Sequence, residues 1–510
     1  MNINPNSERC WIKEYPNLSP QEQVRRYPLF FKNIHFDVFR HLKNMDLEFT
    51  SPISVISGTN KSGKTTALIA IACSHHNFQR RRQTSGNLER NTWGDVMRFT
   101  DHDIQQEDWT YHVTYRRGND IITKQGYRNH TSKKWSGVAK KQGQLDTPRP
   151  GSNQAGRQVT FIDLERLQPA RHLPSSVFKK AKAAPVSNVD NRVSEYMSYV
   201  LEIGYRLDEI CSSADNVIYK FNTSSTYSSY NSASGEDVLS RLLRDIVDTP
   251  NKSLVLIEEI EVGLHPKIQR RLMDVLMYES HVSQKQFIVT THSQTILSSV
   301  NAESRLFLDS NRQKCIKRIS TNAALSKMDA IAYPLLNLLV EDGLAKWIIS
   351  RVINQVNTTV PGFYHLINVV VCGSADKTYS SYCFLRDHHK DLKPKCGYAC
   401  VLDGDKRGEY STVINPDDNI IFIPGNEAPE KVLLSAYLAN HPSQELQYHL
   451  TSSNPHCLFG KMQEHGICSD EETAKNLCWT AYESTAEGQQ AIQELSSFLI
   501  DICKKFSPDL

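Results

Sequence analysis

A glycine-rich turn constrains the fold of this chain more than any other stretch. It lies in VISGTNKSGKTTALIAIA, residues 55–72, and fits G-x-x-x-x-G-K-[ST] at every fixed position. Backbone N–H groups of such a turn cradle phosphate oxygens, and the helix that follows adds the positive end of its dipole. We expect ATP in this turn, with the Lys64 ammonium on the β- and γ-phosphates and the Thr65 hydroxyl on Mg²⁺. The predicted nucleotide-binding residues of the turn are Gly58, Asn60, Lys61, Ser62, Gly63, Lys64, Thr65 and Thr66.

Groups that hydrolysis would need follow at the ends of two later apolar stretches. Residues 254–257, LVLI, are followed by Glu258 and Glu259. The first carboxylate is placed to hold Mg²⁺, and the second to polarise the attacking water. A second apolar stretch leads to His292, which is placed to contact the γ-phosphate. Taken alone, a Glu-Glu pair or a histidine is more simply a surface or core feature, so the prediction depends on their order along the chain.

The segment SASGEDVL, with Ser234 and Gly235, resembles the signature sequence of ABC-type ATPases. The order of turn, signature, acid pair and histidine resembles the ATPase heads of structural-maintenance, recombination-mediator and OLD (overcoming lysogenization defect) proteins. In that family the signature closes over nucleotide from the partner subunit, which implies a homo-oligomer, either a dimer of heads or higher. The chain departs from the family at Glu258, where Asp is usual, and at Ile260, where Pro is usual.

A second pattern of alternating strands and helices begins near residue 330. Glu341 follows its first predicted strand, 335–340, and Asp403 and Asp405 follow its third, 398–402. Carboxyl ends of parallel strands meet at one edge of a sheet, and alternate residues of a strand share a direction, so these carboxylates are expected to face one site. Such oxygen ligands suit Mg²⁺ or Mn²⁺, ions that promote phosphodiester cleavage. Taken alone, Asp-Gly-Asp is more simply a tight turn.

Together with Gly373 in a turn, these acids resemble the TOPRIM domain of topoisomerases, primases and OLD nucleases. The later segment FIPGNEAPEKVL resembles the Pro-Glu segment of ATPase–TOPRIM fusions, which implies Glu430 as a further acid and Lys431 as a contact of the scissile phosphate. Where the family often has a second acid after the first strand, this chain has Ala345, and Asp342 could substitute from another direction. The resemblance therefore implies one metal on the three carboxylates named above and leaves a second metal open.

We predict an α/β chain built in three parts. The parts are an ABC-type P-loop ATPase head at 1–325 with a β-rich and helical insertion at about 80–230, a TOPRIM-like α/β domain at 326–440, and a helical C-terminal segment at 441–510. Residues 1–28 are polar and contain proline, which favours an irregular arm. Apolar residues recur three and four apart over 191–213, which predicts a single helix.

Bulk properties add little about function. The chain has 510 residues and a net charge of +3, too small by itself to argue for nucleic acid. Its 12 cysteines form no metal-ligand pattern and are expected as free thiols. No apolar run reaches the ~18 residues that span a bilayer, and no signal core opens the chain, so we expect a cytoplasmic protein with no membrane partner.

Local basic clusters lie between residues 80 and 182. They suit either a solvated polar face or a surface that contacts DNA phosphates. The clusters are Arg80-Arg81-Arg82, Arg116-Arg117, Lys133-Lys134, Lys140-Lys141, and Lys179-Lys180 with Lys182.

An ATPase head fused to a TOPRIM-like unit, without long coiled-coil arms, resembles the OLD family. This resemblance implies an ATPase that is also a Mg²⁺- or Mn²⁺-dependent DNA endonuclease, gated by the ATPase head and acting in bacterial anti-phage defence. Some family members serve beside a retron reverse transcriptase and its DNA–RNA product, which makes that complex a candidate partner. Two other functions fit the sequence. One is an ATP-driven DNA clamp with a degenerate TOPRIM unit, which Ala345 favours, and the other is a sensor or scaffold that uses ATP for assembly.

Overall fold

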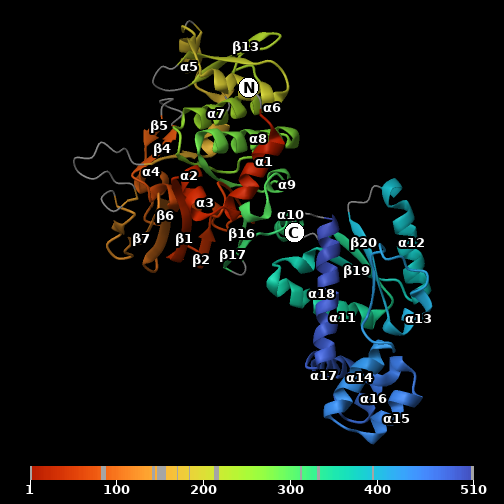
Figure 1. Cartoon of the computed structure of the whole chain (residues 1–510). Helices are drawn as coiled ribbons and strands as arrows, with labels where there is room; N and C mark the ends of the chain where they lie inside the picture. Colours follow the sequence, from red (N-terminus) through yellow and green to blue (C-terminus); the bar gives the residue numbers. More distant parts are fainter. Residues whose placement is uncertain are drawn as a thin grey trace. The chain divides into compact units, whose positions relative to one another are not determined.

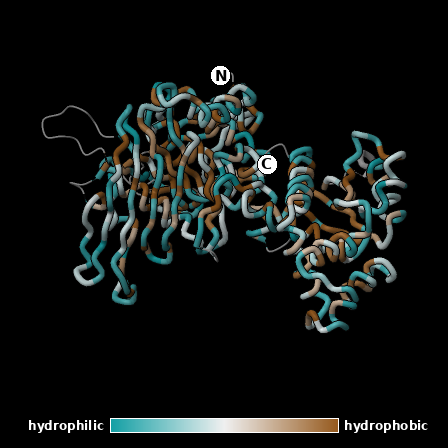
Figure 2. Tube along the Cα trace, turned by 60° about the horizontal axis from the view of Figure 1, so that its bottom comes forward, coloured by the Kyte–Doolittle hydropathy of each residue, from teal (hydrophilic) through white to brown (hydrophobic). Residues whose placement is uncertain are grey.

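The chain folds into two compact units, Met1–Met328 and Asp329–Leu510 (Figure 1). This computed structural model describes residues 3–81, 88–140, 144–145, 157–168, 170–182, 184–211, 217–310, 313–329, 333–392 and 396–506. Apolar stretches run through the inside of each unit, and polar stretches lie toward its outside (Figure 2). No helix in these ranges combines the length and the apolar character that crossing a membrane requires.

An eight-stranded sheet organises the first unit, in the order β17-β16-β3-β15-β14-β9-β4-β5. The strands from β16 to β4 run parallel, and the two edge strands are antiparallel to their neighbours. Strands β3, β14 and β15 are buried along their whole length, as expected for parallel strands that are covered on both faces. The strands are β3 (Ile53–Gly58), β4 (Asn77–Arg81), β5 (Leu88–Arg90), β9 (Gln158–Ile162), β14 (Leu254–Ile257), β15 (Gln286–Thr290), β16 (Arg305–Asp309) and β17 (Lys314–Lys317).

One face of this sheet is covered by helix α3 (Lys64–Cys73), which in turn contacts a five-stranded antiparallel sheet of order β2-β1-β6-β7-β8. Every residue of α3 except Thr65 is buried, so the helix has no solvent face along most of its length. Residues 109–137, expected in an insertion, therefore extend the sheet that begins at β1. The strands are β1 (Leu29–Phe39), β2 (Leu42–Glu48), β6 (Trp109–Arg117), β7 (Asp120–Arg128) and β8 (Trp135–Gly137).

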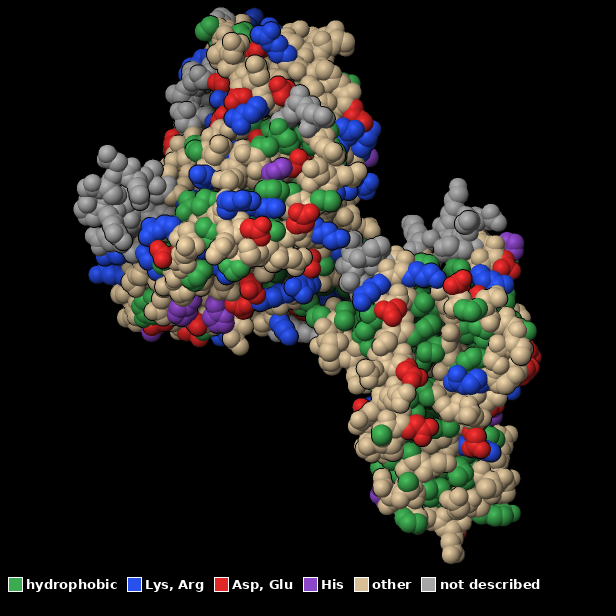
Figure 3. Space-filling model, in the orientation of Figure 1, with side chains coloured by type: hydrophobic (Ala, Val, Ile, Leu, Met, Phe, Trp, Pro, Cys, Tyr) green, Lys and Arg blue, Asp and Glu red, His purple; other side chains and the backbone are tan. Residues whose placement is uncertain are grey.

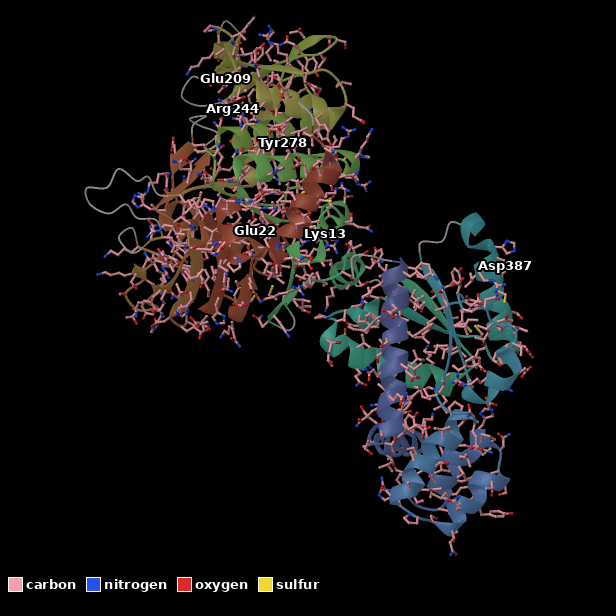
Figure 4. All side chains as sticks on the ribbon, in the orientation of Figure 1. Lys13, Glu22, Glu209, Arg244, Tyr278 and Asp387 are labelled. Atoms are coloured by element: carbon pink, nitrogen blue, oxygen red, sulfur yellow. The ribbon has the colours of Figure 1, made fainter. Side chains whose placement is uncertain are left out.

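Longer helices pack on the other side of the parallel sheet, where α8 contacts β15 and β3 and α7 contacts β9. A small antiparallel sheet, β10-β11-β12-β13, joins α7 through Arg244, whose guanidinium lies 2.6 Å from the Glu209 carboxylate (Figure 4). The elements are α5 (Ser175–Ala181), β10 (Ser187–Asn188), α6 (Asn191–Leu201), β11 (Arg206–Cys211), β12 (Ile218–Asn222), β13 (Thr226–Ser228), α7 (Ser234–Asp248), α8 (Pro266–Ser283), α9 (Gln294–Ser298) and α10 (Thr321–Asp329).

The predicted irregular arm at 1–28 is helical, so that expectation was wrong. Helices α1 (Pro5–Glu14) and α2 (Pro20–Arg26) each begin with proline behind a capping residue, Asn4 or Ser19. Prolines suit the first turn of a helix because their missing N–H is not needed there. Burial of Ile12 against α8 supplies the stabilisation that the polar sequence did not indicate.

The predicted single helix at 191–213 was also wrong. Helix α6 ends at Leu201, where Glu202 has a left-handed φ of 61°. Ile203, one of the apolar residues of that spacing, is 52% exposed, and Leu207 is buried on strand β11. Residues on one face of a strand happened to continue the helical spacing.

A four-stranded parallel sheet, β19-β18-β20-β21, forms the centre of the second unit. Helix α12 packs against β18 and β20 on one face, and α18 packs against the same strands on the opposite face (Figure 1). Helix α11 contacts β19 and α18. The strands are β18 (Leu336–Val340), β19 (Ile367–Val371), β20 (Gly397–Leu402) and β21 (Ile420–Phe422).

Helices make up the rest of the second unit, and α14, α16 and α17 pack together at one end of it. They are α11 (Gly343–Thr359), α12 (Ala375–Leu392), α13 (Arg407–Tyr410), α14 (Pro429–Asn440), α15 (Gln444–Ser452), α16 (Leu458–Glu464), α17 (Glu471–Glu483) and α18 (Ala486–Phe506). Short elements elsewhere are α4 (Trp93–Val96) and the 3-10 turns η1 (Tyr15–Asn17), η2 (Leu164–Leu167), η3 (Ala170–His172), η4 (Ala302–Ser304), η5 (Phe363–His365), η6 (Gly404–Lys406) and η7 (Pro455–Cys457).

Candidate functional site

The glycine-rich turn lies between β3 and α3, as its sequence predicted. Gly58 has a φ of 149°, and a Cβ there would lie 2.6 Å from the Leu308 carbonyl oxygen on the neighbouring strand. Gly63 has a φ of 99°, and its Cβ would lie 2.5 Å from Leu42 at the β1–β2 turn. Both positions therefore require glycine for conformation and for space. Lys61 also has a positive φ, 65°, which completes the tightly curved backbone of the turn.

Polar groups of the turn fit a bound polyphosphate. The Lys64 ammonium donates to the carbonyl oxygens of Gly58 and Thr59, both at 2.9 Å, so it already lies over the mouth of the turn. The Ser62 hydroxyl is buried and has no hydrogen-bond partner among the described residues. Burial lowers the pKa of Lys64 to about 8, and nearby glutamates offset part of that effect. Asn60 is exposed and Thr66 is buried at the start of α3.

Thr65 and Glu258 meet directly at the ends of α3 and β14. The Thr65 hydroxyl donates to the Glu258 carboxylate, although the two residues lie 193 positions apart. Burial raises the pKa of Glu258, and the Thr65 hydrogen bond opposes that shift. A hydroxyl and a carboxylate in contact are the protein ligands that a nucleotide-bound Mg²⁺ uses in P-loop proteins, so these groups fit such an ion.

Asp163 belongs to the same acidic edge and was not predicted. It directly follows β9, the neighbour of β14, and burial raises the pKa of its carboxyl. Its carboxylate is paired with Arg80, which also lies 2.8 Å from Glu165. These residues line one cleft with Thr65 and Glu258. The available signal was an acid immediately after a buried strand in VTFID, the same pattern that identified the Glu258 position.

Two hydrogen bonds fix the backbone of Glu259, and neither of them involves its carboxylate. Its φ is 42°, its N–H donates to the Thr290 hydroxyl at 2.9 Å, and its carbonyl accepts from the Arg166 guanidinium at 2.7 Å. Arg166 is buried and also donates to the Asp163 carbonyl at 2.8 Å. The sequence did not single out Arg166, because its partner Glu259 lies 93 positions further along the chain.

His292, predicted to contact the γ-phosphate, is close enough to Lys64 for the Lys64 charge to act on it, and the phosphate contact stays a prediction. Burial lowers the pKa of His292, and the Lys64 charge lowers it further. The Glu261 carboxylate fixes the segment by accepting from the His292 N–H at 2.5 Å and from the Thr291 hydroxyl at 2.8 Å. Glu261 therefore fixes the backbone on which the His292 side chain is carried.

Ser234 and Gly235 begin helix α7, behind the residue Ala233 that caps it. A Cβ on Gly235 would lie 3.1 Å from the carbonyl oxygen of Gly263, in the loop that follows the acid pair. In the described part of the chain, neither residue makes a hydrogen bond or ion pair with the phosphate-binding turn.

The acids of the second unit also gather at the carboxyl ends of parallel strands. Glu341 follows β18, and its carboxylate accepts from the Asp403 N–H at 2.6 Å, next to the end of β20. Burial raises the pKa of Glu341 and raises that of Asp403 to about 8, with Glu341 the next contributor for Asp403. One carboxylate oxygen of Asp403, Oδ1, is buried without a hydrogen-bond partner in the described residues. A cation would satisfy that oxygen, so the donor set fits Mg²⁺ or Mn²⁺.

The strand-alternation argument for Asp405 was wrong. Strand β20 ends at Leu402, and Asp405 lies in the 3-10 turn η6, so the two aspartates do not share a strand direction. Asp405 is exposed, 3.8 Å from the Lys406 ammonium, yet its charge still raises the pKa of Asp403. Gly404 is needed between them because a Cβ there would lie 2.5 Å from the Gly425 carbonyl oxygen.

The basic clusters divide into buried and exposed members. Arg81 is paired with Asp245 and Asp248, and Arg116 donates to Tyr15 and Gln23, so these cations stabilise the fold, as does the Arg80 pair. On the face that Figure 3 shows, Lys and Arg side chains of the first unit are interspersed with acidic ones. Arg82 and Lys141 lie outside the described residues. The exposed members are Arg117, Lys133, Lys134, Lys140, Lys179, Lys180 and Lys182.

A family model described as "AAA domain, putative AbiEii toxin, Type IV TA system" matches residues 178–298. The matched stretch contains Ser234, Glu258, Glu259 and His292, and it begins after the phosphate-binding turn. No curated protein sequence matches the chain.

The solved structures to which the chain is similar include two Smc head domains and the protein RecF. A Smc head domain from Pyrococcus furiosus, bound to the C-terminal domain of ScpA, is 10% identical over 56% of this chain and 95% of that chain, with a TM-score of 0.37. The SMC head domain from Thermotoga maritima is 13% identical over 54% and 94%, with a TM-score of 0.33. The recombination mediator protein RecF, solved as RecF-ATPrS, is 12% identical over 57% and 98%, with a TM-score of 0.33.

The class of the first unit follows from its own geometry and from the family match. A phosphate-binding turn between β3 and α3 lies beside an acid pair at the end of β14. The residues that follow the turn match an AAA domain. The first unit is thus a P-loop ATPase domain within an α/β chain of mixed sheets.

Proposed function

We propose that the chain is an ATPase whose second unit is a divalent-metal-dependent DNA endonuclease of the OLD type. The ATPase half rests on the direct contact between Thr65 and Glu258 beneath Lys64. The nuclease half rests on one observation, the buried and unpartnered Oδ1 of Asp403 beside Glu341. A buried carboxylate oxygen without a donor is costly unless a cation or proton satisfies it.

In the ATPase site, each side chain has a distinct role in the proposal. Lys64 neutralises the β- and γ-phosphates, and Thr65 with Glu258 holds Mg²⁺. Glu259 accepts a proton from the attacking water, and its fixed backbone keeps its carboxylate in place. His292, whose neutral form burial favours, donates a hydrogen bond to the γ-phosphate.

Two heads would join through Ser234 and Gly235. Those residues begin a 15-residue helix, and helix N-termini attract phosphate groups. In the proposal, Ser234 and Gly235 contact nucleotide that is bound by a second copy, in a homo-oligomer. ATP binding would then set the spacing of the two nuclease units and so gate cleavage.

In the nuclease unit, Glu341, Asp403 and Asp405 would hold Mg²⁺ or Mn²⁺, which supplies Lewis acidity and an activated water for phosphodiester cleavage. Exposed Lys179, Lys180 and Lys182 on and after α5 are the cations available to DNA phosphates. The resemblance to OLD proteins extends the proposal to anti-phage defence. The partner implied by that resemblance is a retron reverse transcriptase with its DNA–RNA product.

Plasmid cleavage tests both halves of the proposal. The assay compares wild type, Asp403→Ala and Lys64→Ala with Mg²⁺ or Mn²⁺, each with and without ATP. We expect Asp403→Ala to abolish cleavage and Lys64→Ala to abolish only its dependence on ATP. Asp387→Asn, an exposed acid of α12 paired with Arg386, is the matched control and should cut like wild type (Figure 4). Equal cleavage by wild type and Asp403→Ala would remove the nuclease assignment.

One observation favours a second candidate, an ATP-driven DNA clamp that does not cut. Ala345, which replaces the family's second acid, is fully buried in α11, so no carboxylate could be accommodated there without rearrangement. In a clamp, ATP would close two heads on DNA, and the acids of the second unit would only stabilise the fold. ATP-dependent retention of circular DNA, without nicking by wild type in either metal, would favour the clamp.

A further inference from the structure

A second group of potential metal ligands lies in the second unit. Asp342, Glu430 and His456 each place one ligand atom within 4.8 Å of the others. Asp342 caps α11, Glu430 lies in the first turn of α14, and His456 lies in the 3-10 turn η7. The sequence analysis named Asp342 as a substitute acid and Glu430 as a further acid, whereas His456 belongs to none of the motifs described above.

Each side chain of the group has a ligand atom available. Asp342 Oδ1 accepts from the Ala345 N–H at 2.8 Å, which fixes the carboxylate and leaves Oδ2 for another partner. Glu430 is only 4% exposed, and its Oε1 lies 2.7 Å from His456 Nδ1. The His456 side chain is 69% exposed. The group is therefore buried at one end and open at the other, which gives an ion a path of entry.

The surrounding charge favours a cation at this group. No Lys or Arg in the described residues forms an ion pair with Asp342 or Glu430, and the one ion pair of Glu430 is with His456. Oδ1 of Asp403 has no hydrogen-bond partner among the described residues. The charges of Asp342 and Glu430 both raise the pKa of Asp403, so all three carboxyl groups lie near one another. The acids accumulate negative charge that the described side chains do not neutralise, and a divalent ion would neutralise it.

The geometry points to a second cation site in which Asp342, Glu430 and His456 bind a first-row transition metal ion. Two carboxylates and one imidazole form a mixed oxygen and nitrogen donor set, which prefers Mn²⁺ or Zn²⁺ to Mg²⁺. Three protein ligands leave further coordination positions for water or for a phosphate oxygen. His456 thus supplies the ligand that Ala345 cannot, from a segment more than a hundred residues later.

The role of this ion rests on the proposed nuclease function, but its binding does not. As the companion of an ion at Glu341 and Asp403, it would make the site selective for Mn²⁺ over Mg²⁺. A plainer role for His456 is to hydrogen-bond Glu430 and shield that buried carboxylate. The two roles differ in whether the imidazole nitrogen touches a metal, which can be measured directly.

Mn²⁺ binding to the full chain without nucleotide provides the test, followed by electron paramagnetic resonance. We expect a ¹⁴N modulation in the electron spin echo of wild type that His456→Asn removes, because asparagine keeps a donor to Glu430 but is a poor metal ligand. The same substitution should weaken the tightest Mn²⁺ site by at least about tenfold. His441→Asn, an exposed histidine that caps the same helix α14, is the matched control and should match wild type.

Two results would overturn the assignment. One is an unchanged ¹⁴N signal and Mn²⁺ affinity in His456→Asn. The other is loss of the signal in His449→Asn alone, since His449 lies 3.3 Å from His465 and that pair is an alternative nitrogen source in the same unit. Glu430→Gln gives an independent check, because it should weaken Mn²⁺ as His456→Asn does.

Failure of this site and failure of the nuclease can be told apart. Mn²⁺ with a nitrogen ligand from His456, in a protein that never cuts plasmid, would leave the metal site standing and remove the nuclease. Cleavage that depends on Asp403, with Mn²⁺ binding indifferent to His456, would leave the nuclease standing and remove this site.

Discussion

The two units differ in which side chains surround their clustered carboxylates. Both collect carboxylates at the carboxyl ends of parallel strands, Glu258 in the first unit and Glu341 with Asp403 in the second. In the first unit, Lys64 and Arg166 are close enough to interact with the acids. In the second, other acids are the main neighbours, and burial together with those acids raises the pKa of Asp403 to about 8. At the acid-bearing edge of the first sheet, cationic side chains already offset the carboxylates, which suits a ligand that carries negative phosphates together with its metal ion. At the acid-bearing edge of the second sheet, the carboxylates need a bound cation to offset their charge.

Removing the cation of the first edge should have the largest effect. Lys64→Ala leaves Glu258 and Glu259 without their ammonium neighbour, so the first edge comes to resemble the second. We expect ATP hydrolysis to fall by at least about 100-fold, because charge on the phosphates is no longer neutralised. Phosphate release measures this effect, and Lys13→Ala, an exposed lysine of α1, should behave as wild type (Figure 4). Undiminished turnover in Lys64→Ala would contradict the proposal that the Lys64 ammonium neutralises charge at the ATPase site.

Glu259→Gln tests whether the second acid of the pair acts in chemistry rather than in binding. The amide cannot accept a proton from water, and we expect turnover to fall by about 100-fold while nucleotide affinity stays within twofold. The backbone contacts of residue 259 to Thr290 and Arg166 do not involve the side chain, so the fold should be unaffected. Equal losses in affinity and turnover would instead assign Glu259 to metal binding.

The pH dependence of stability should distinguish the second edge. The pKa of Asp403 is about 8 in the fold and ~3.9 in an unfolded chain. Between those values the native state binds the extra proton, so the free energy of unfolding falls as pH rises from about 4 to 8. Asp403→Asn removes this contribution, and we expect its metal-free second unit to melt ~2–8 °C above wild type at pH 8 and within error of it at pH 4.

Divalent ions supply the control for that experiment. Adding Mn²⁺ at pH 8 should raise the melting temperature of wild type more than that of Asp403→Asn, because the wild-type carboxylate gains a partner. If the variant melts below wild type at pH 8 without metal, Asp403 stabilises the fold as an anion. That result would contradict the expectation that ionised Asp403 destabilises the second unit.

Arg166→Lys should give the smallest effect. Lysine keeps the charge but cannot donate to both the Glu259 and Asp163 carbonyls with the geometry of a guanidinium. We expect a fall in turnover of about three- to tenfold, with nucleotide affinity unchanged. In the Glu259→Gln background the same substitution should have little further effect, because Arg166 acts by positioning Glu259. Independent, multiplicative losses would contradict that role.

Local patterns predicted the parts of the fold that local sequence controls. The phosphate-binding turn and the buried strands β14 and β15 were readable because close backbone approach and burial on both faces restrict residue types. The helices at 1–28 were missed because burial of Ile12 against α8 joins segments far apart in the chain. The single helix predicted over 191–213 was wrong because apolar residues of strand β11 continue the three- and four-residue spacing of helix α6.

The candidate sites show the same division. Glu258 in the first unit follows a recognisable strand, and so do Glu341 and Asp403 in the second. The position of each acid at the end of its strand could therefore be predicted, as could the proximity of Glu341 to Asp403. Asp405 lies in a 3-10 turn that strand alternation does not describe. His456 approaches Glu430 through helical packing that no short pattern encodes.

One packing detail of the second unit bears on how the chain is made. Phe506 of α18 covers Gly397 at the start of β20 so closely that a Cβ there would lie 2.1 Å from its ring. Lys505 of the same helix donates to the Asn419 side chain at 2.8 Å, just before β21. That face of strands β18 and β20 is therefore closed only by α18, the last described element of the chain to be synthesised. The first unit is complete by residue 328 and can fold while the ribosome is still translating, whereas the acid-lined sheet must assemble after α18 has emerged.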